Sequence, residues 1–177
     1  CHFCYFVMKE YFSTENEHFT NNSLLSKLTI IILSLNRQGY LLRNLYYWSG
    51  KNVDVFALDG SAEPIEPKFL TKLSPTIRYL HIPEGIRYRL SEAIQLTTTE
   101  YTMLLGDDEL YIPSALESCI SKLEEEPELV CCMGRCLQFT PRKQGLMGRS
   151  AYQEMKDYSL LQNNPEETIE LPGLTVG

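Results

Sequence analysis

From residue 28 onward, short β-branched or apolar runs alternate with longer segments that have one apolar and one polar face. This alternation is typical of βα units around a mostly parallel sheet. The apolar runs predict strands over residues 29–35, 53–58, 77–81, 101–105 and 129–133. The amphipathic segments predict helices over residues 40–48, 67–73, 86–96 and 114–124. We therefore expect an α/β fold, with an open, mostly parallel sheet flanked by helices in a Rossmann-like arrangement.

The spacing of apolar residues predicts which side of the helix over residues 86–96 is buried. Ile86, Leu90 and Ile94 recur at i, i+4 and i+8, and so line one face of a helix. Ala93 fills the same face, whereas charged residues occupy the other. We expect the apolar face to pack against the sheet.

The pattern of elements weakens toward the end of the chain. Ser114 and Glu117 have the spacing of a capping box and predict the start of the helix over residues 114–124. Beyond Phe139, residues 140–149 are rich in glycine and basic residues, which predicts a flexible loop. No clear βα periodicity follows this loop.

Charge and hydropathy exclude several classes of protein. The net charge of −7 argues against a general nucleic-acid-binding protein, which needs a basic surface to displace counterions from phosphates. The longest apolar run, residues 28–35, is far shorter than the roughly 20 residues of a membrane-spanning helix. The first residues also lack the basic region of a secretion signal. We therefore expect a cytoplasmic protein with no transmembrane segment and no nucleic-acid partner.

The cysteines are interpreted as reduced thiols of a cytosolic protein, because no export signal accompanies them. They are Cys1, Cys4, Cys119, Cys131, Cys132 and Cys136. A zinc site is the alternative, with the ligands Cys1, Cys4, Cys132 and Cys136. The spacing of these cysteines is not that of a regular zinc motif, so we favour the thiols.

Polar residues follow three of the predicted strands, at residues 34–37, 59–61 and 107–109. Each cluster alone has an ordinary explanation, since Asn and Ser often cap helices and Asp-Gly-Ser often forms a turn. In an open α/β sheet, however, ligands bind beyond the carboxyl ends of the strands. The adjacent acids Asp107, Asp108 and Glu109 repel one another unless solvent, a cation or a metal-bearing phosphate ligand relieves them. The sequence therefore predicts a metal-assisted nucleotide site.

These segments resemble those of the family 2 glycosyltransferases. Residues 28–37, Leu-Thr-Ile-Ile-Ile-Leu-Ser-Leu-Asn-Arg, followed by Tyr40 and Leu41, are similar to the opening strand of that family. Residues 53–61 end in Asp-Gly-Ser and resemble the second strand. Residues 99–109 resemble the acidic segment called the DxD motif. The order and separation of these segments agree from Leu28 to about Phe139.

The resemblance implies a GT-A-like fold, a nucleotide-sugar donor, with a UDP-sugar favoured, and Mg²⁺ or Mn²⁺ as cofactor. It implies that Ser34, Leu35 and Asn36 border the nucleotide base. Asp59 would accept a hydrogen bond from the base, and Arg89 would contact the pyrophosphate.

For the metal and the ribose, the resemblance implies Asp107 together with Asp108 or Glu109. The acidic motif reads Gly-Asp-Asp-Glu, so either Asp108 or Glu109 aligns as the second ligand, and both alternatives remain open. The chain also departs from the family pattern at Leu33 and Leu58, where Pro and a second Asp are common.

The sequence identifies no catalytic base. In inverting family members, an Asp or Glu beyond the acidic motif deprotonates the attacking hydroxyl group. The candidates are Glu154, Asp157, Glu166, Glu167 and Glu170. None lies in a recognisable motif.

The sequence is expected to divide into three parts. These are a loose lead-in over residues 1–26, a nucleotide-sugar-binding GT-A-like domain over residues 27–140, and a loop-rich, incomplete acceptor region over residues 141–177.

The sequence thus predicts a metal-assisted, inverting glycosyltransferase of the hexosyltransferase type. The implied acceptor is a glycan or glycolipid, used in polysaccharide assembly at the cytoplasmic face of a membrane. One alternative is a truncated or degenerate nucleotide-binding domain without catalysis. Another is a haloacid-dehalogenase-like phosphatase, although Ser61 stands where that motif needs a second Asp.

Overall fold

The computed structural model describes residues 23–132, 137–142, 145–150 and 159–161. By their contacts, the residues group into two compact units that meet in sequence between Tyr111 and Ile112. The lead-in predicted over residues 1–26 lies mostly outside the described residues, and a short 3₁₀ helix, η1, occupies Leu24–Lys27. The domain boundary near residue 140 stays a prediction.

The first unit is built on a four-stranded parallel sheet with the strand order β3-β2-β1-β4. The strands are β1 (Leu28–Ser34), β2 (Asp54–Asp59), β3 (Ile77–His81) and β4 (Tyr101–Gly106). Each lies within a residue or so of its predicted position, and the predicted α/β fold class is confirmed. The parallel order follows from the intervening segments, since a parallel pair needs a long crossover connection.

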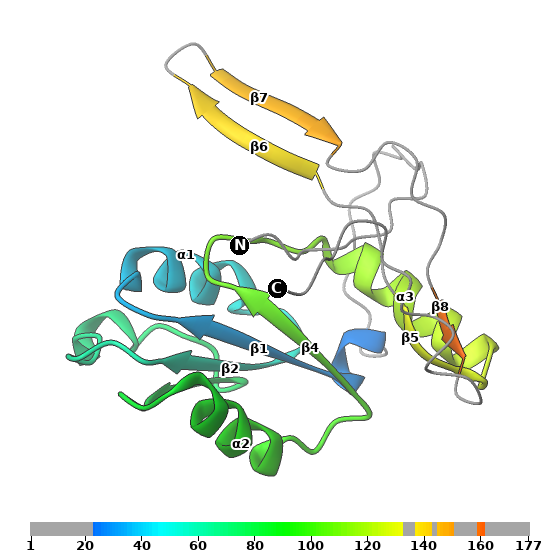
Figure 1. Ribbon diagram of the computed structural model, residues 1–177, viewed down its shortest axis with the longest axis horizontal. Helices are drawn as coiled ribbons and strands as arrows, with labels where there is room; N and C mark the ends of the chain where they lie inside the picture. The colour runs from blue at the N-terminus through cyan, green and yellow to red at the C-terminus, as the bar shows by residue number, and fades with distance from the viewer. Residues whose placement is uncertain (1–22, 133–136, 143–144, 151–158, 162–177) are drawn as a thin grey trace, which may run out of the picture. The chain divides into compact units, whose positions relative to one another are not determined.

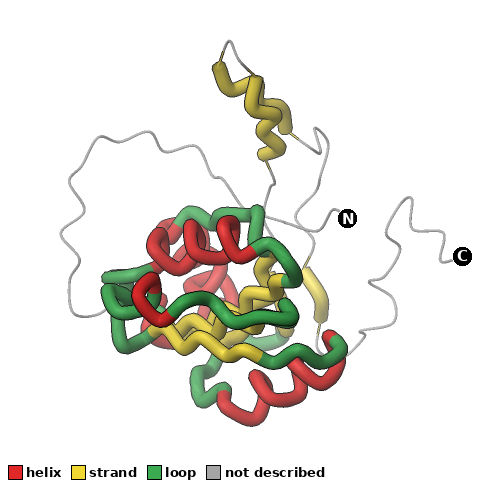
Figure 2. The backbone as a smooth tube through the Cα atoms, turned by 90° about the vertical axis from the view of Figure 1, so that its left-hand side faces the viewer, coloured by secondary structure: helices red, strands yellow, loops and turns green. Residues whose placement is uncertain are grey.

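Strand β1 is at the centre of this sheet, between β2 and β4. Its residues are buried along almost the whole strand, which explains why it is a continuous apolar run rather than an alternating one. Helices α1 (Gln38–Trp48) and α2 (Ile86–Leu96) cover opposite faces of the sheet, as Figures 1 and 2 show. Leu41, Leu45 and Trp48 of α1 are fully buried.

Helix α2 begins and ends where predicted, but only Leu90 and Ala93 of the face predicted to be buried pack against the core. Ile86 and Ile94 are 51% and 65% exposed, whereas the buried residues of α2 are Arg89 and Ala93. Ala93 packs in a cluster with buried apolar residues of β1 and β2. The small side chain of Ala93 lets the helix approach the sheet closely, and Arg89 turns inward because backbone carbonyl groups accept its hydrogen bonds.

Two further helix predictions need correction. The helix predicted over residues 67–73 is only a 3₁₀ turn, η2, over Pro67–Phe69. Helix α3 spans Pro113–Glu125, and its N-cap is Ile112, with no side-chain hydrogen bond from a capping box. Pro113 lies in the first turn of this helix, where a missing N–H group leaves no donor unsatisfied. Proline, rather than Ser114, therefore marks the start of α3.

The second unit contains antiparallel strand pairs. Strand β5 (Leu129–Cys132) pairs with β8 (Ser159–Leu161), and β6 (Leu137–Arg142) pairs with β7 (Gly145–Ser150). The flexible loop predicted over residues 140–149 is therefore wrong, because most of it forms a hairpin. Backbone pairing across a short connection makes these strands, and it needs no apolar periodicity in the side chains.

In the parts of the chain that the structure describes, no helix combines the length and apolarity that crossing a bilayer requires. The zinc alternative depends on Cys1, Cys4 and Cys136, which lie outside the described residues.

Candidate active site at the carboxyl edge of the sheet

The strand register brings the predicted polar clusters to one edge of the sheet. Ser34, the last residue of β1, is the Cα partner of Asp59 at the end of β2. On the other side of β1, Leu33 is paired with Gly106, so Asp107 follows at the level of Ser34. The Ser34 hydroxyl donates a 2.8 Å hydrogen bond to Oδ2 of Asp107. Ser34 thus lies between two aspartates contributed by distant parts of the chain.

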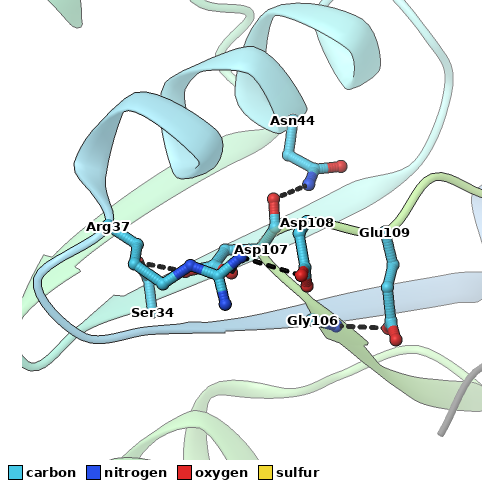
Figure 3. A network of polar contacts seen from close by, with 7 residues as sticks. All are labelled: Ser34, Arg37, Asn44, Gly106, Asp107, Asp108 and Glu109. Carbon is cyan, nitrogen blue, oxygen red and sulfur yellow. Dashed lines mark hydrogen bonds and ion pairs between the residues drawn. The ribbon is translucent and has the colours of Figure 1, made fainter. Parts of the chain in front are cut away.

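Asp107 and Asp108 share one cationic partner, Arg37, which immediately precedes α1 (Figure 3). Nη2 of Arg37 lies 3.3 Å from Oδ1 of Asp107 and 2.8 Å from Oδ2 of Asp108. The Asp107 side chain is only 5% exposed, whereas that of Asp108 is 51% exposed. Asn44 of α1 donates to the backbone carbonyl of Asp107 and holds the start of this turn against the helix.

The two aspartates differ in their electrostatics. Burial raises the pKa of the Asp107 carboxyl, although the Ser34 hydrogen bond and the charge of Arg37 oppose this rise. The hydrogen bond from Arg37 lowers the pKa of Asp108 below its usual value. Arg37 therefore sets the direction of the shift at Asp108, whereas burial outweighs it at Asp107.

Glu109 does not join the two aspartates. Its Oε2 atom accepts a 2.9 Å hydrogen bond from the backbone N–H of Gly106, so the side chain points back along the turn (Figure 3). The carboxylates that face a common point are therefore those of Asp107 and Asp108. Over the described ranges, no group of three or more His, Cys, Asp or Glu residues is arranged to hold a metal ion.

Asp59 is completely buried, and the protein itself satisfies its carboxylate. Oδ1 accepts from the backbone N–H of Ser61, while Oδ2 accepts from the Tyr79 hydroxyl and from Nε2 of Gln38. Burial alone raises the pKa of Asp59, but hydrogen bonds from Ser61, Tyr79 and Gln38 outweigh it and hold the pKa below the usual value. Burial also raises the pKa of Tyr79, to about 12.

The loop after β1 reaches the surface beside these acids. Asn36 has φ 55°, a left-handed conformation that asparagine tolerates better than most residues. Its backbone N–H donates to Oγ of Ser61, which ties this loop to the loop after β2. Leu35 is 54% exposed. The loop predicted to bind the base thus lies at the surface, and the hydrogen bond between Asn36 and Ser61 fixes its centre.

Arg89 lies inside the protein rather than at the surface of the site. Nη1 of its guanidinium donates to the carbonyl groups of Ser34 and Leu58, and the residue is 5% exposed. A Cβ atom on Gly60 would lie 2.6 Å from Cζ of Arg89, so any other residue here would force the guanidinium to shift. Arg89 thus joins the ends of β1 and β2 through their carbonyl groups, and its predicted contact with a pyrophosphate stays a prediction.

Several residues that shape the site were not assigned a role from the sequence. Gln38 and Tyr79 support Asp59, and Asn44 supports Asp107. No local pattern distinguishes them from ordinary helix and strand residues. Arg37 adjoins the predicted loop, and only the folded chain shows that it contacts Asp107 and Asp108.

The paired carboxylates suit a hard divalent cation. Oxygen atoms from Asp107 and Asp108 already converge on one positively charged nitrogen atom. Mg²⁺ is commonly held by one or two carboxylates, with substrate phosphates and water completing the coordination. The donor set therefore fits a cation that binds together with a diphosphate, even though the protein supplies few ligands.

The parallel sheet, its flanking helices and the acidic turn at its carboxyl edge define a GT-A-like α/β fold. A model of the glycosyl transferase family 2 matches residues 29–171 of the chain. Since this match covers most of the sequence, the chain belongs to the family 2 glycosyltransferases. Comparison with curated proteins gave no significant match.

The geometry argues against the phosphatase alternative. In that mechanism Asp59 would attack the phosphorus atom and would need an accessible carboxylate oxygen. Asp59 is fully buried, and both of its carboxylate oxygens accept hydrogen bonds from the chain.

Proposed function

We propose that this protein transfers a hexose from a nucleoside diphosphate sugar, with a UDP-sugar as the favoured donor, to a glycan or glycolipid acceptor. The observation that carries the proposal is the convergence of Asp107 and Asp108 on one cationic group at the carboxyl edge of the sheet. Ser34, which bonds Asp107 and is paired with Asp59, links this acidic turn to the loops that would hold the nucleotide. Family membership supports the reaction class.

In the proposed complex, Asp107 and Asp108 would hold Mg²⁺ or Mn²⁺ together with the diphosphate. Ser34 orients the Asp107 carboxylate, and Asn44 fixes the backbone of the same residue. The bound cation would stabilise the negative charge that develops on the departing nucleoside diphosphate. Glu109 is omitted from the proposed ligands because its carboxylate bonds the Gly106 N–H.

The nucleotide base is proposed to lie against the exposed loop of Leu35 and Asn36. Asp59 is proposed to position this loop through Ser61. The Asp59 carboxylate accepts a hydrogen bond from the backbone N–H of Ser61, and the Ser61 hydroxyl accepts one from the backbone N–H of Asn36. A direct hydrogen bond from Asp59 to the base would require one of its present donors to move. We therefore assign Asp59 and Arg89 positioning roles in the proposed site.

Transfer with inversion requires one displacement at the anomeric carbon. The acceptor oxygen forms a bond to this carbon as the bond to the diphosphate oxygen breaks, and a general base takes the hydroxyl proton. The nucleoside diphosphate leaves with the bonding electrons. The candidate bases Glu154, Asp157, Glu166, Glu167 and Glu170 all lie outside the described residues, so the base stays unassigned.

Binding and catalysis are tested separately. Titration calorimetry with UDP, GDP and CDP, each with and without Mn²⁺, is expected to show metal-dependent binding of at least one nucleotide. Release of nucleoside diphosphate from the matching sugar donor, with a glycan or membrane glycolipid acceptor, then measures turnover. Metal-dependent binding without turnover would favour the non-catalytic nucleotide-binding alternative. Failure of all three nucleotides to bind in the presence of Mn²⁺ or Mg²⁺ would contradict the proposed function.

A further inference from the structure

Arg37 occupies the position in the acidic turn where a bound cation would be expected. Its Nη2 atom alone contacts both Asp107 and Asp108, at 3.3 and 2.8 Å. One positive charge therefore relieves the repulsion between two adjacent carboxylates, one of which is buried. Figure 3 shows the arginine side chain extending from the start of α1 to these acids.

The contacts that hold Arg37 in place are largely on the protein surface. Its side chain is 43% exposed, and its guanidinium lies over the ring of Tyr40, with Cζ 4.7 Å from the ring centre. Tyr40 is itself 48% exposed and also contacts Arg43, whose Cζ lies 5.2 Å from the same ring. The ion pair with half-exposed Asp108 and the cation–π contact with Tyr40 are exposed contacts, which contribute little to stability. Arg37 can therefore leave the acids without loss of buried packing.

Asp107 is held differently and cannot follow Arg37. Ser34 holds its carboxylate, and Asn44 holds its backbone carbonyl, both by hydrogen bonds within the protein interior. If Arg37 swings away, the aspartate oxygen that it contacted remains at the same place. Asp107 is thus fixed in place, whereas Arg37 can be displaced.

We propose that Arg37 is an exchangeable internal counter-cation that competes with the divalent metal ion for Asp107 and Asp108. This inference rests on the proposed function for the identity of the competing cation. Before metal binding, Arg37 bridges the two carboxylates and relieves their mutual repulsion. Asp107 and Asp108 would then offer a divalent cation the oxygens that Nη2 now contacts, and the Arg37 guanidinium would turn toward solvent.

Competition predicts that removal of the arginine strengthens metal binding. Arg37→Gln keeps a polar side chain, although a shorter one, and removes the charge. Binding of Mn²⁺ alone, followed by the electron paramagnetic resonance signal of the free ion, is expected to become about fivefold tighter in this variant. A residue that merely supported the fold or ligated a phosphate would leave Mn²⁺ affinity unchanged or weaken it.

Arg43→Gln is the matched control. It removes an equal charge from an exposed residue that contacts the same tyrosine ring. Arg43 forms no ion pair with Asp107 or Asp108 among the described residues, and its charge acts on both carboxylates only weakly. Its effect on Mn²⁺ affinity should therefore stay within about twofold at physiological ionic strength. Urea unfolding of both variants checks that each remains as stable as the unmodified protein.

The outcomes separate this inference from the proposed function. Equal or weaker Mn²⁺ binding by Arg37→Gln overturns the inference, as does an equal gain in Arg43→Gln or absence of Mn²⁺ binding in every variant. Nucleotide binding in the unmodified protein decides the proposed function independently. If UDP binds with Mn²⁺ while Arg37→Gln shows no gain, only the counter-cation role fails.

Discussion

The carboxyl ends of β2 and β4 lie on either side of β1, and each carries an aspartate that the protein holds in a different way. Asp59, at the end of β2, is enclosed and accepts hydrogen bonds from neutral donors on three separate segments. Asp107 and Asp108, after β4, are held together by one half-exposed arginine.

This difference indicates which carboxylate is available to a ligand. A ligand that displaced the hydrogen-bond donors of Asp59 would leave polar groups unpaired inside the protein, which is energetically unfavourable. Replacing the arginine at Asp107 and Asp108 exchanges one cation for another at the surface. Asp59 is thus suited to fixing the shape of the site, and the acidic turn after β4 is suited to binding a cation.

The largest expected effect is on the acidic turn. Asp107→Asn should reduce metal-dependent nucleotide binding and sugar transfer by roughly 10²-fold or more, because a neutral amide is a poor ligand for a hard cation. The amide oxygen can still accept the Ser34 hydrogen bond, so the fold should be retained. Calorimetry with UDP and Mn²⁺ measures the loss.

Asp54→Asn is the control for this change, because Asp54 lies at the opposite end of β2. It removes the same charge and should leave binding and transfer unaltered. The comparison breaks down if Asp54→Asn and Asp107→Asn impair binding equally.

The second prediction contrasts the stability contributions of the two strand ends. Asp59→Asn should reduce the free energy of unfolding by about 2–3 kcal/mol, because the NH2 group of the amide would face a donor in either orientation. It would face the Ser61 N–H group in one orientation, and Gln38 and Tyr79 in the other. Asp108→Asn should change it by about 1 kcal/mol or less, since its ion pair with Arg37 is half exposed. Urea titration followed by circular dichroism measures both. If both variants lost a similar amount of free energy of unfolding, the proposed difference between the two strand ends would be wrong.

The third prediction concerns the close packing of the Arg89 guanidinium against Gly60. Gly60→Ala should destabilise the protein by about 1–3 kcal/mol, because the new methyl group would overlap the Arg89 guanidinium. Gly39→Ala is the matched control, since no atom lies within 4 Å of the added Cβ. Because Gly39 is in α1, alanine there should stabilise the helix slightly. Thermal unfolding of both variants compares them, and an unperturbed Gly60→Ala would show that Arg89 is not tightly enclosed.

The smallest expected effect is a pH dependence at Asp59. Its folded-state pKa is below the usual value because hydrogen bonds from Ser61, Tyr79 and Gln38 outweigh burial. The resulting stability is present above the unfolded-state pKa of about 3.9 and is lost as the pH falls through the folded-state value. The stability advantage of the unmodified protein over Asp59→Asn should therefore shrink below about pH 4. Urea titrations between pH 6 and pH 3 test this, and an advantage that grew on acidification would contradict it.

The positions of the main strands followed from the sequence because they depend on local patterns. The β-branched run at β1 can be buried on both faces only in a sheet that helices cover on both sides, which makes a parallel α/β arrangement predictable. In such a sheet the residues after each strand share one edge, so the grouping of Ser34, Asp59 and Asp107 was also predictable. The hairpin of β6 and β7 was missed because backbone pairing creates it without an apolar pattern.

Only the tertiary structure decided how the side chains at that edge are used. Ser34 and Asp107 are 73 positions apart, and Arg89 finds its acceptors 55 and 31 positions earlier in the chain. The inward turn of Arg89, the bond of Glu109 to Gly106 and the exposure of Ile94 all depend on which neighbour comes within reach after folding. Periodicity specifies which residues can share a surface, whereas the direction of a polar side chain depends on hydrogen-bond partners that only the packed chain supplies.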